Sequence, residues 1–246
     1  MKLWDSVEIL VPFPAVYIPS LDTIVMADLH LGYEGIMAEQ GVFLPKIQFR
    51  LEVEMLERIR EICPAGRILL NGDVKHEFSE TGYHEFLEVR DLFSLLVRSF
   101  EEVLVVKGNH DNYLIRTTKR FGITPRERIT LGNFHFCHGH RPVDVRMEAH
   151  ECLIIAHEHP SILLTDEVGG REKLPCLLYG EFSGRRIIVL PAFSPLAEGS
   201  QVNIVPPEEL LSPVLREEQR IDRLRAIGLS REVGALEFPE IGRMRF

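Results

Sequence analysis

The sequence lacks the features that mark several classes of protein. Its 246 residues carry a formal net charge of −9, so it has no excess of the lysine and arginine on which a general nucleic-acid coating protein depends. No apolar run approaches the roughly 20 residues of a membrane-spanning helix, and the N-terminus has no continuous apolar signal core. These absences predict a cytoplasmic protein without a membrane segment. They leave room for an enzyme with a local basic groove.

Cysteine, asparagine and glutamine are also scarce. The four cysteines (Cys63, Cys137, Cys152 and Cys176) show no Cys-X-X-Cys spacing and lie in apolar surroundings, which predicts buried thiols rather than disulfides or a zinc site. The chain has five asparagines and four glutamines, and this scarcity is typical of thermophilic proteins. With 45% hydrophobic and 26% charged residues, the composition is otherwise that of an ordinary globular protein.

In the first half of the chain, short apolar runs alternate with segments of helical periodicity. The predicted elements are a strand pair at 7–11 and 15–18, strands at 23–27, 67–70 and 103–106, and helices at 46–62, 83–100 and about 112–121. Strands that alternate with helices predict βαβ units and a parallel sheet. Right-handed crossovers place the carboxyl ends of these strands at one edge, where open α/β sheets bind ligands.

In the second half of the chain, the short apolar runs no longer alternate regularly with helical segments. Short strands separated by glycine and aspartate turns are predicted at 129–131, 134–137, 152–156, 161–165, 174–179 and 186–190. They predict a second, antiparallel or mixed sheet packed on the first. Beyond Pro206, spaced leucines among many charges predict an amphipathic helix. Without a linker or an internal repeat, we expect one domain over 1–246, with a catalytic core at about 20–205 and a charged helical tail at about 206–246.

Side chains with metal-binding chemistry follow the predicted strands. They are Asp28, His30, Asp73, Asn109, His138, His157 and His159. Carboxylate, imidazole and amide ligands together suit borderline divalent ions, with manganese expected and iron, zinc, cobalt or nickel as alternatives. Seven ligands are too many for one ion with an open position, but they suit two ions about 3.5–4 Å apart that share a carboxylate and a solvent molecule.

Each of these pieces has a plainer reading when it is taken alone. Asp28 and His30 could cap a helix, and Gly72-Asp73 is a common turn dipeptide. The segment 109–111 could be a loop that hydrogen-bonds its own backbone. All the pieces lie at strand ends, however, and all carry ligand chemistry, which favours a site with two metal ions.

The order of these motifs resembles that of the calcineurin-like metallophosphoesterase superfamily over about residues 23 to 193. The matching motifs are Asp28-X-His30, Gly72-Asp73, Gly108-Asn109-His110-Asp111, His138-Gly139 and His157-X-His159. The resemblance implies an αββα fold, in which two mixed β-sheets pack face to face and helices flank them. Within the superfamily, the segments 28–32 and 72–78 resemble archaeal SbcD-related phosphoesterases and their DNA-ligase-associated bacterial relatives.

The resemblance also implies a role for each motif residue. The first ion would be held by Asp28, His30, Asp73 and His159. The second ion would share Asp73 and be completed by Asn109, His138 and His157. His110 matches the histidine that contacts the scissile phosphate and assists the leaving oxygen, and Asp111 matches the acid that orients His110.

Three features depart from the family pattern or compete with it. Ala156 replaces the usual glycine before the last motif, which is tolerated where its φ is negative. The segment after Asp73 lacks the Asp-Arg-Gly ending of phosphoprotein phosphatases, which disfavours that substrate class. His140 competes with His138 as a ligand. We favour His138 because the motif's ligand directly precedes glycine, and we expect His140 to line the pocket instead.

Other polar residues have two readings each. Lys75 and His76 could bind a substrate phosphate or cap the next helix. The basic residues Arg116, Lys119, Arg120, Arg126 and Arg128 could form a solvated helix face or guide a polyanionic substrate. We expect His84, His135 and His150 to be structural or surface residues.

The sequence therefore predicts a metal-dependent phosphoesterase. We expect hydrolysis of a phosphodiester, with DNA or a nucleotide favoured, through in-line attack by a hydroxide that bridges two divalent ions. The runner-up is a phosphomonoesterase that acts on a small molecule or a phosphoprotein. A non-catalytic scaffold is disfavoured because the sequence retains all the predicted ligands and His110. A protein partner in DNA metabolism and a homo-oligomer are compatible with the sequence, and a membrane partner is not expected.

Overall fold

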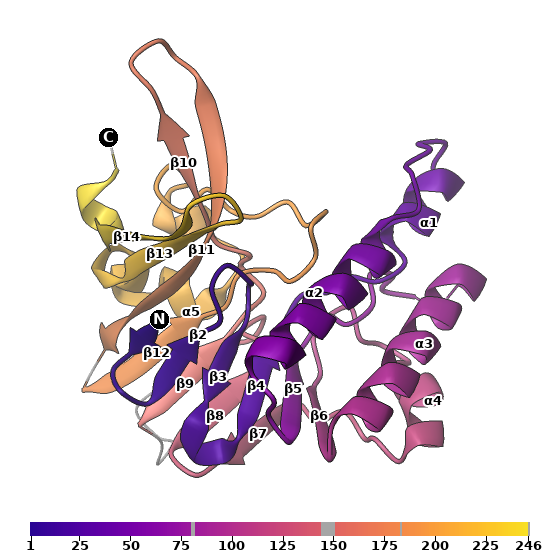
Figure 1. The fold of residues 1–246 in the computed structure, drawn as a ribbon. Helices are drawn as coiled ribbons and strands as arrows, with labels where there is room; N and C mark the ends of the chain where they lie inside the picture. The colour runs from indigo at the N-terminus through magenta and orange to yellow at the C-terminus, as the bar shows by residue number, and fades with distance from the viewer. Residues whose placement is uncertain (80–81, 144–150, 183, 246) are drawn as a thin grey trace.

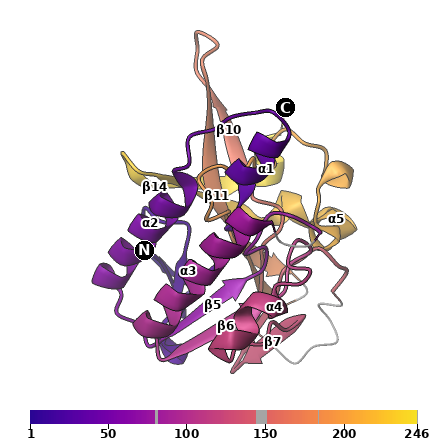
Figure 2. The same cartoon turned by 90° about the vertical axis from the view of Figure 1, so that its right-hand side faces the viewer.

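Two β-sheets lie face to face in the computed structural model, and helices cover the outer face of the first sheet (Figures 1 and 2). The structure describes residues 1–79, 82–143, 151–182 and 184–245, so His150 lies outside the described residues. The arrangement is the predicted αββα fold. That the whole chain forms one domain stays a prediction.

The first sheet contains six strands in chain order. They are β1 (Lys2–Leu3), β2 (Val7–Ile9), β3 (Val16–Ile18), β4 (Thr23–Met26), β5 (Arg67–Asn71) and β6 (Glu102–Val106). Strands β4, β5 and β6 are parallel, as the alternation of strands and helices predicted. The crossovers are α2 (Gln48–Ile62) and α3 (Tyr83–Ser99), which start and end within two residues of their predicted bounds.

The second sheet is mixed and contains eight strands. They are β7 (Arg128–Leu131), β8 (Phe134–Cys137), β9 (Cys152–Ile155), β10 (Ser161–Thr165), β11 (Arg171–Phe182), β12 (Arg185–Val189), β13 (Arg225–Ser230) and β14 (Gly234–Glu240). The pairs β8–β9 and β9–β12 are parallel, and the other pairs are antiparallel. The hairpin of β10 and β11 projects from the sandwich (Figure 1).

Three layers of apolar side chains hold these elements together. The middle layer joins the two sheets, with Val25 and Leu69 of the first facing Ile154 and Ile188 of the second. One outer layer packs α2 and α3 onto the first sheet, and the other packs the C-terminal segment onto the second sheet. All four cysteines are free and buried, as expected. None of the helices within the described ranges is long and apolar enough to cross a membrane.

The predicted helical tail is wrong over most of its length. In its described part, up to residue 245, the only α-helix is α5 (Pro213–Arg216), which 3-10 turns precede and follow, and residues 225–240 form the antiparallel pair β13–β14. Prolines at 206, 207 and 213 limit helix length, because proline lacks an amide donor. Gly228 further disfavours a helix at β13, and Gly234 turns the chain between the strands at a φ of 86°.

The other helix predictions need smaller corrections. The helix expected at about 112–121 is reduced to α4 (Ile115–Thr118) and a 3-10 turn, Lys119–Phe121. A short helix, α1 (Tyr33–Glu39), was not predicted. It contains Gly35 and follows Gly32, which has a φ of 88°, and neither glycine signals a helix.

Candidate metal centre

The loops after five strands meet at one end of the sandwich and hydrogen-bond to each other. The backbone amide of Asp28 donates to Gly72 O at 3.0 Å, and that of His30 donates to Asp73 O at 3.0 Å. The amide of His110 donates to Asp73 Oδ1 at 2.9 Å, which joins the loop after β6 to the loop after β5. In the second sheet, Ala156 N donates to His138 O. The predicted convergence of strand ends therefore occurs.

Five of the seven predicted ligands have left-handed backbone conformations. Their φ angles are 58° at Asp28, 50° at His30, 50° at Asp73, 72° at His157 and 47° at His159. Residues other than glycine avoid this region because of steric conflict, and strained backbone concentrates at functional sites. Ala156 lies outside this region, so its β-carbon is tolerated where the family has glycine.

The predicted ligands form two clusters of nitrogen and oxygen atoms. The first contains Asp28, His30 and His159, each of which offers one ligand atom within 4.8 Å of the others. Nε2 of His159 lies 3.2 Å from Nε2 of His30 and 3.3 Å from Oδ1 of Asp28.

The second cluster contains Asp73, His138 and His157. Nε2 of His138 lies 3.1 Å from Oδ2 of Asp73 and 3.2 Å from Oδ1 of Asn109. His138 joins this cluster, whereas His140 does not belong to any such group within the described residues.

Asp73 faces both clusters. Its Oδ2 atom lies 3.1 Å from Nε2 of His138 in the second cluster and 3.9 Å from Nε2 of His30 in the first cluster. A carboxylate with this placement can serve two cations at once. All seven predicted ligands are thus brought together around one buried carboxylate.

The donor set fits divalent cations in its protonation chemistry. Burial lowers the pKa of His30 to about 3, and burial together with the neighbouring His138 lowers that of His157 to about 4, so both imidazoles are neutral and able to bind metal. Burial opposes the charged form of His138, yet the carboxylates of Asp73 and Asp28 raise its pKa to about 9. A cation beside these carboxylates takes the place of that proton.

The surroundings of the Asp28 carboxylate also support a cation site. Oδ1 of Asp28 is buried and has no hydrogen bond of good geometry within the described residues, although Nε2 of His159 lies 3.3 Å away. A buried carboxylate oxygen whose neighbours are imidazoles at 3.3 Å and 3.8 Å is poorly hydrogen-bonded, and coordination of a cation would remove that cost. The residues present therefore fit a pair of divalent ions.

Neighbouring groups fix the orientation of these side chains. Nδ1 of His138 donates to the carbonyl oxygen of Asn71 at 3.0 Å, because a carbonyl can only accept, and this leaves Nε2 free to face Asp73. The amide of Asn71 donates to Cys137 O and Ile154 O, which ties β5 to the second sheet. Asn71 was not predicted to take part. Its only sequence signal is a polar residue at the end of a buried strand.

Close packing explains two glycines. A β-carbon on Gly108 would lie 2.0 Å from Oδ1 of Asp73, and one on Gly72 would lie 2.2 Å from Nδ1 of His138. Gly72 also has a φ of 98°, whereas Gly108 does not lie in the left-handed region. Gly108 is therefore required because Asp73 approaches its backbone closely.

The expected pairing of Asp111 with His110 is wrong. The carboxylate of Asp111 instead accepts hydrogen bonds from the backbone amides of Val74, Lys75 and Gly108. Nδ1 of His110 donates to the carbonyl oxygen of His76. Asp111 follows His110 in the chain but points into the loop, where it satisfies three buried amides. It shapes the loop that carries Asn109 and His110.

A cleft of about 290 Å³ opens beside the clusters. Its walls include His30, His110 and His159, together with Tyr33 and His76. Nε2 of His110 lies 3.9 Å from Oδ2 of Asp73. The histidine predicted to face the substrate therefore stands between the carboxylate and the cleft.

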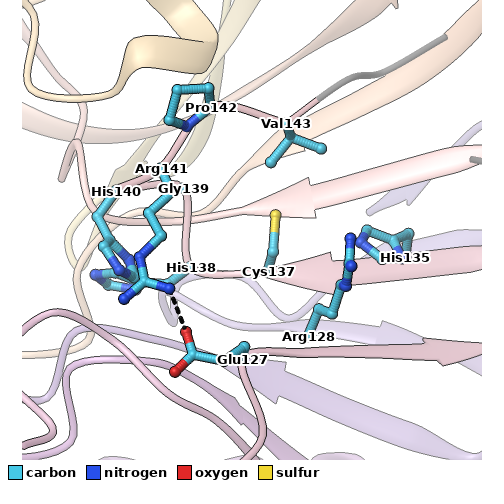
Figure 3. Close-up of a pocket in the computed structure, with 10 residues that line it drawn as sticks. All are labelled: Glu127, Arg128, His135, Cys137, His138, Gly139, His140, Arg141, Pro142 and Val143. Atoms are coloured by element: carbon cyan, nitrogen blue, oxygen red, sulfur yellow. Dashed lines mark hydrogen bonds and ion pairs between the residues drawn. The ribbon is translucent and has the colours of Figure 1, made fainter. Parts of the chain in front are cut away.

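A second pocket of about 510 Å³ has His138 in its wall (Figure 3). His140 lines it, with its ring centre 5.4 Å from that of His138, as expected for a pocket residue. Arg128 and Arg141 also line it, and Nη1 of Arg141 donates to Glu127 at 3.0 Å. Two arginines and three histidines line this pocket with one glutamate, so its polar lining suits an anion.

The remaining polar predictions have mixed outcomes. The basic residues Arg116, Lys119, Arg120, Arg126 and Arg128 are all exposed. Lys75 is fully buried and donates to the carbonyls of Glu77 and Ser79, so it does not contact the cleft. His84 is exposed, and His135 is buried against Thr130, as expected of surface and structural residues.

Glu158 was overlooked between the two histidines of the last motif. It is fully buried and accepts hydrogen bonds from the backbone amides of Leu211 and Ser212 and from the hydroxyl of Ser200. The hydroxyl of Ser212 in turn donates to Gly139 O at 2.9 Å. The C-terminal segment therefore braces both histidine loops of the second sheet.

Comparison with known proteins agrees with this geometry. Residues 21–224 match the family described as calcineurin-like phosphoesterase. A search of curated proteins finds no match. The structure of the nuclease MPE of Pseudomonas putida has 19% sequence identity and a TM-score of 0.64, with 92% of each chain covered. The phosphoesterase Yfce of E. coli has 15% identity and a TM-score of 0.40, with 86% of this chain and 90% of that chain covered. The likeness to the Pseudomonas putida structure shows a shared fold.

Proposed function

The chain belongs to the calcineurin-like phosphoesterase family, and we propose from this premise that it hydrolyses phosphodiesters with two divalent metal ions, with a nucleic acid or a nucleotide as substrate. Manganese is the ion we expect. The observation that carries the proposal is the position of Asp73, whose Oδ2 atom faces two histidine-containing clusters beside an open cleft.

The side chains divide into two groups of ligands. Asp28, His30 and His159 would hold one ion, and Asn109, His138 and His157 would hold the other, with Asp73 shared between them. When bound, such ions supply Lewis acidity and a nucleophile from water at neutral pH. The left-handed backbone at five of these positions supports a ligand role, because that strain needs a functional reason.

His110 would act on the phosphate itself. Its Nδ1 proton is held by the carbonyl of His76, so Nε2 is the nitrogen that faces the reacting group. A protonated Nε2 would donate a hydrogen bond to a phosphoryl oxygen, and it could pass its proton to the leaving alkoxide. Fixing Nδ1 in this way aligns the imidazole before the substrate arrives.

Two observations favour a diester with an extended chain. The pocket lined by Arg128 and Arg141 adjoins His138, where a phosphate or sugar next to the scissile bond can bind. The resemblance to SbcD-related and DNA-ligase-associated phosphoesterases, and the nuclease named among the similar structures, accord with DNA. The net charge of −9 would restrict this attraction to the local basic surface.

A substrate panel with the purified protein and added manganese tests the proposal. We expect turnover of bis-p-nitrophenyl phosphate and of single- or double-stranded DNA, and weaker turnover of p-nitrophenyl phosphate. Activity on monoesters alone would overturn the diesterase proposal. Absence of activity on every substrate, with metal bound, would instead favour a scaffold.

Matched variants separate chemistry from substrate binding. His110→Ala is expected to keep its metal ions but lose most turnover of bis-p-nitrophenyl phosphate, whereas His84→Ala, at an exposed position, serves as its control.

Arg141→Ala is expected to raise KM for DNA and to leave turnover of the small diester unaffected. Arg98→Ala is the control, because Arg98 lies in the last turn of α3, at the end of the sheet where β6 begins. Equal KM values for DNA in the two arginine variants would refute the pocket's role.

A further inference from the structure

His76 contacts His30 of the first ligand cluster and also His110, the histidine predicted to face the substrate. Its Nδ1 atom lies 3.3 Å from Nδ1 of His30, and its backbone oxygen accepts the Nδ1 proton of His110. Its ring lines the 290 Å³ cleft. His76 lies in the segment 72–78, but none of the five motifs that carry the predicted ligands and His110 includes it, and neither a phosphate contact nor a helix cap accounts for these contacts.

The protonation of His30 decides the direction of the contact between the two rings. Nε2 of His30 faces the first cluster, 3.2 Å from Nε2 of His159. A neutral imidazole that binds a cation through Nε2 carries its proton on Nδ1. Nδ1 of His30 must then donate, and Nδ1 of His76 must accept. Histidine ligands usually give this hydrogen to a carboxylate, a carbonyl or water, and here a second imidazole takes that place.

The segment that carries His76 is firmly held. The backbone amides of His76 and Glu77 donate to Oε1 of Glu85 at 2.9 Å and 2.8 Å. Lys75 is fully buried, with Nζ 3.8 Å from Oε2 of Glu85 and bonded to two carbonyls of the same segment. Tyr33 packs edge-on against the His76 ring at 4.8 Å between ring centres. These contacts place the acceptor nitrogen in a defined position.

We propose that His76 is a positioning residue that fixes the tautomer and ring orientation of His30 through its side chain and aligns His110 through its backbone. This inference rests on the proposed metal centre. Nitrogen atoms of His30, His76 and His110 also lie within 4.8 Å of one another. A third ion there is disfavoured, because neutral His30 cannot give both ring nitrogens to cations and Nδ1 of His110 is already bonded to a carbonyl.

Two variants of similar size isolate the acceptor. In His76→Asn, the side-chain oxygen stands close to the place of Nδ1 and can accept from His30, whereas His76→Leu has the same branching and no acceptor. Both keep the backbone oxygen that holds His110. His76→Gln is a second polar variant, whose amide extends past the Nδ1 position and is expected to resemble leucine. His84→Leu, at an exposed position, is the control.

The readout is metal binding rather than turnover alone. Manganese affinity and stoichiometry are measured by calorimetry, and the visible spectrum of the cobalt-loaded protein reports the ligand geometry. We expect His76→Leu to bind one ion about 10- to 100-fold more weakly with an altered cobalt spectrum. The Asn variant is expected to recover most of this affinity, and stoichiometry is expected to stay at two ions in every variant.

Three results would overturn the inference. Equal affinities and spectra for the Asn and Leu variants would show that the acceptor does not matter. Loss of one ion from the stoichiometry of both variants would make His76 a ligand itself. A wild-type protein that binds fewer than two ions would refute the proposed metal centre, and the positioning role would fail with it.

Discussion

The substitution Gly108→Ala probes the close approach on which the site depends. A β-carbon at this position would lie 2.0 Å from Oδ1 and 2.3 Å from the backbone nitrogen of Asp73, whereas an ordinary contact needs at least 3.4 Å. The backbone at Asp73 would therefore have to move by about 1 Å, which is the difference between 3.4 and 2.3 Å. A flexible side chain could rotate away, but a backbone nitrogen inside a parallel pair of strand ends cannot.

The expected cost follows from this displacement. Overpacking of a buried site costs about 1–3 kcal/mol, and 1 kcal/mol corresponds to about 2–4 °C of Tm in a chain of this size. A misplacement of about 1 Å at a reacting centre can lower turnover about 100-fold. We expect Gly108→Ala to lose about 2–12 °C in Tm and about 100-fold in kcat/KM on bis-p-nitrophenyl phosphate with manganese.

Gly82→Ala is the matched control for this prediction. It makes the same chemical change at a glycine where a β-carbon would meet no atom of the described residues within 4 Å and φ is −63°. We expect turnover to stay near the wild-type value, while Tm falls by about 2–4 °C because alanine is a poorer N-cap than glycine by about 1 kcal/mol. Wild-type turnover and Tm in Gly108→Ala would show that the position of Asp73 does not depend on this close approach.

Three further predictions concern the buried polar groups. Asp111→Ala leaves three backbone amides without their acceptor, at a cost of about 1–3 kcal/mol each. The free energy of unfolding measured in urea should therefore fall by several kcal/mol. A change below about 0.5 kcal/mol would contradict the structural role of Asp111. Burial raises the pKa of Glu52 well above its usual value. A raised carboxyl pKa stabilises the fold below the unfolded value near 4.5 and loses that contribution as pH rises. Between pH 5 and 8, the Tm of Glu52→Gln should therefore fall less than the Tm of the wild-type protein. Identical profiles of Tm against pH would contradict this prediction. Removal of metal by a chelator should lower the free energy of unfolding, and Tm with it, by about 2.7 kcal/mol for each ion present at 100 times its Kd. Asp73→Ala should respond less, and equal responses would argue against Asp73 as a shared ligand.

The parallel core could be predicted because its signals are local and repeated. Strands β4, β5 and β6 are continuous apolar runs, and α2 and α3 carry helical stripes, so each segment specifies its own structure. The ligand set could be predicted for a related reason. Metal-binding side chains directly follow these strands, and parallel pairing brings strand ends together wherever the sheet forms.

The predictions that failed depend on contacts that the sequence does not display. In the tail, Leu215, Ile221 and Leu224 have helical spacing, yet each packs on the outer face of the second sheet from a short turn. Asp111 was paired with its neighbour His110, but adjacent side chains in a loop point in different directions. The contact between His76 and His30 joins residues 46 positions apart, and a single sequence holds no signal for it.

Anomalous diffraction at the manganese edge, from crystals grown with manganese, tests whether two metal ions share Asp73. We expect two anomalous peaks that both adjoin Asp73, one beside Asp28, His30 and His159 and the other beside Asn109, His138 and His157. A single peak, or peaks that do not both adjoin Asp73, would contradict it.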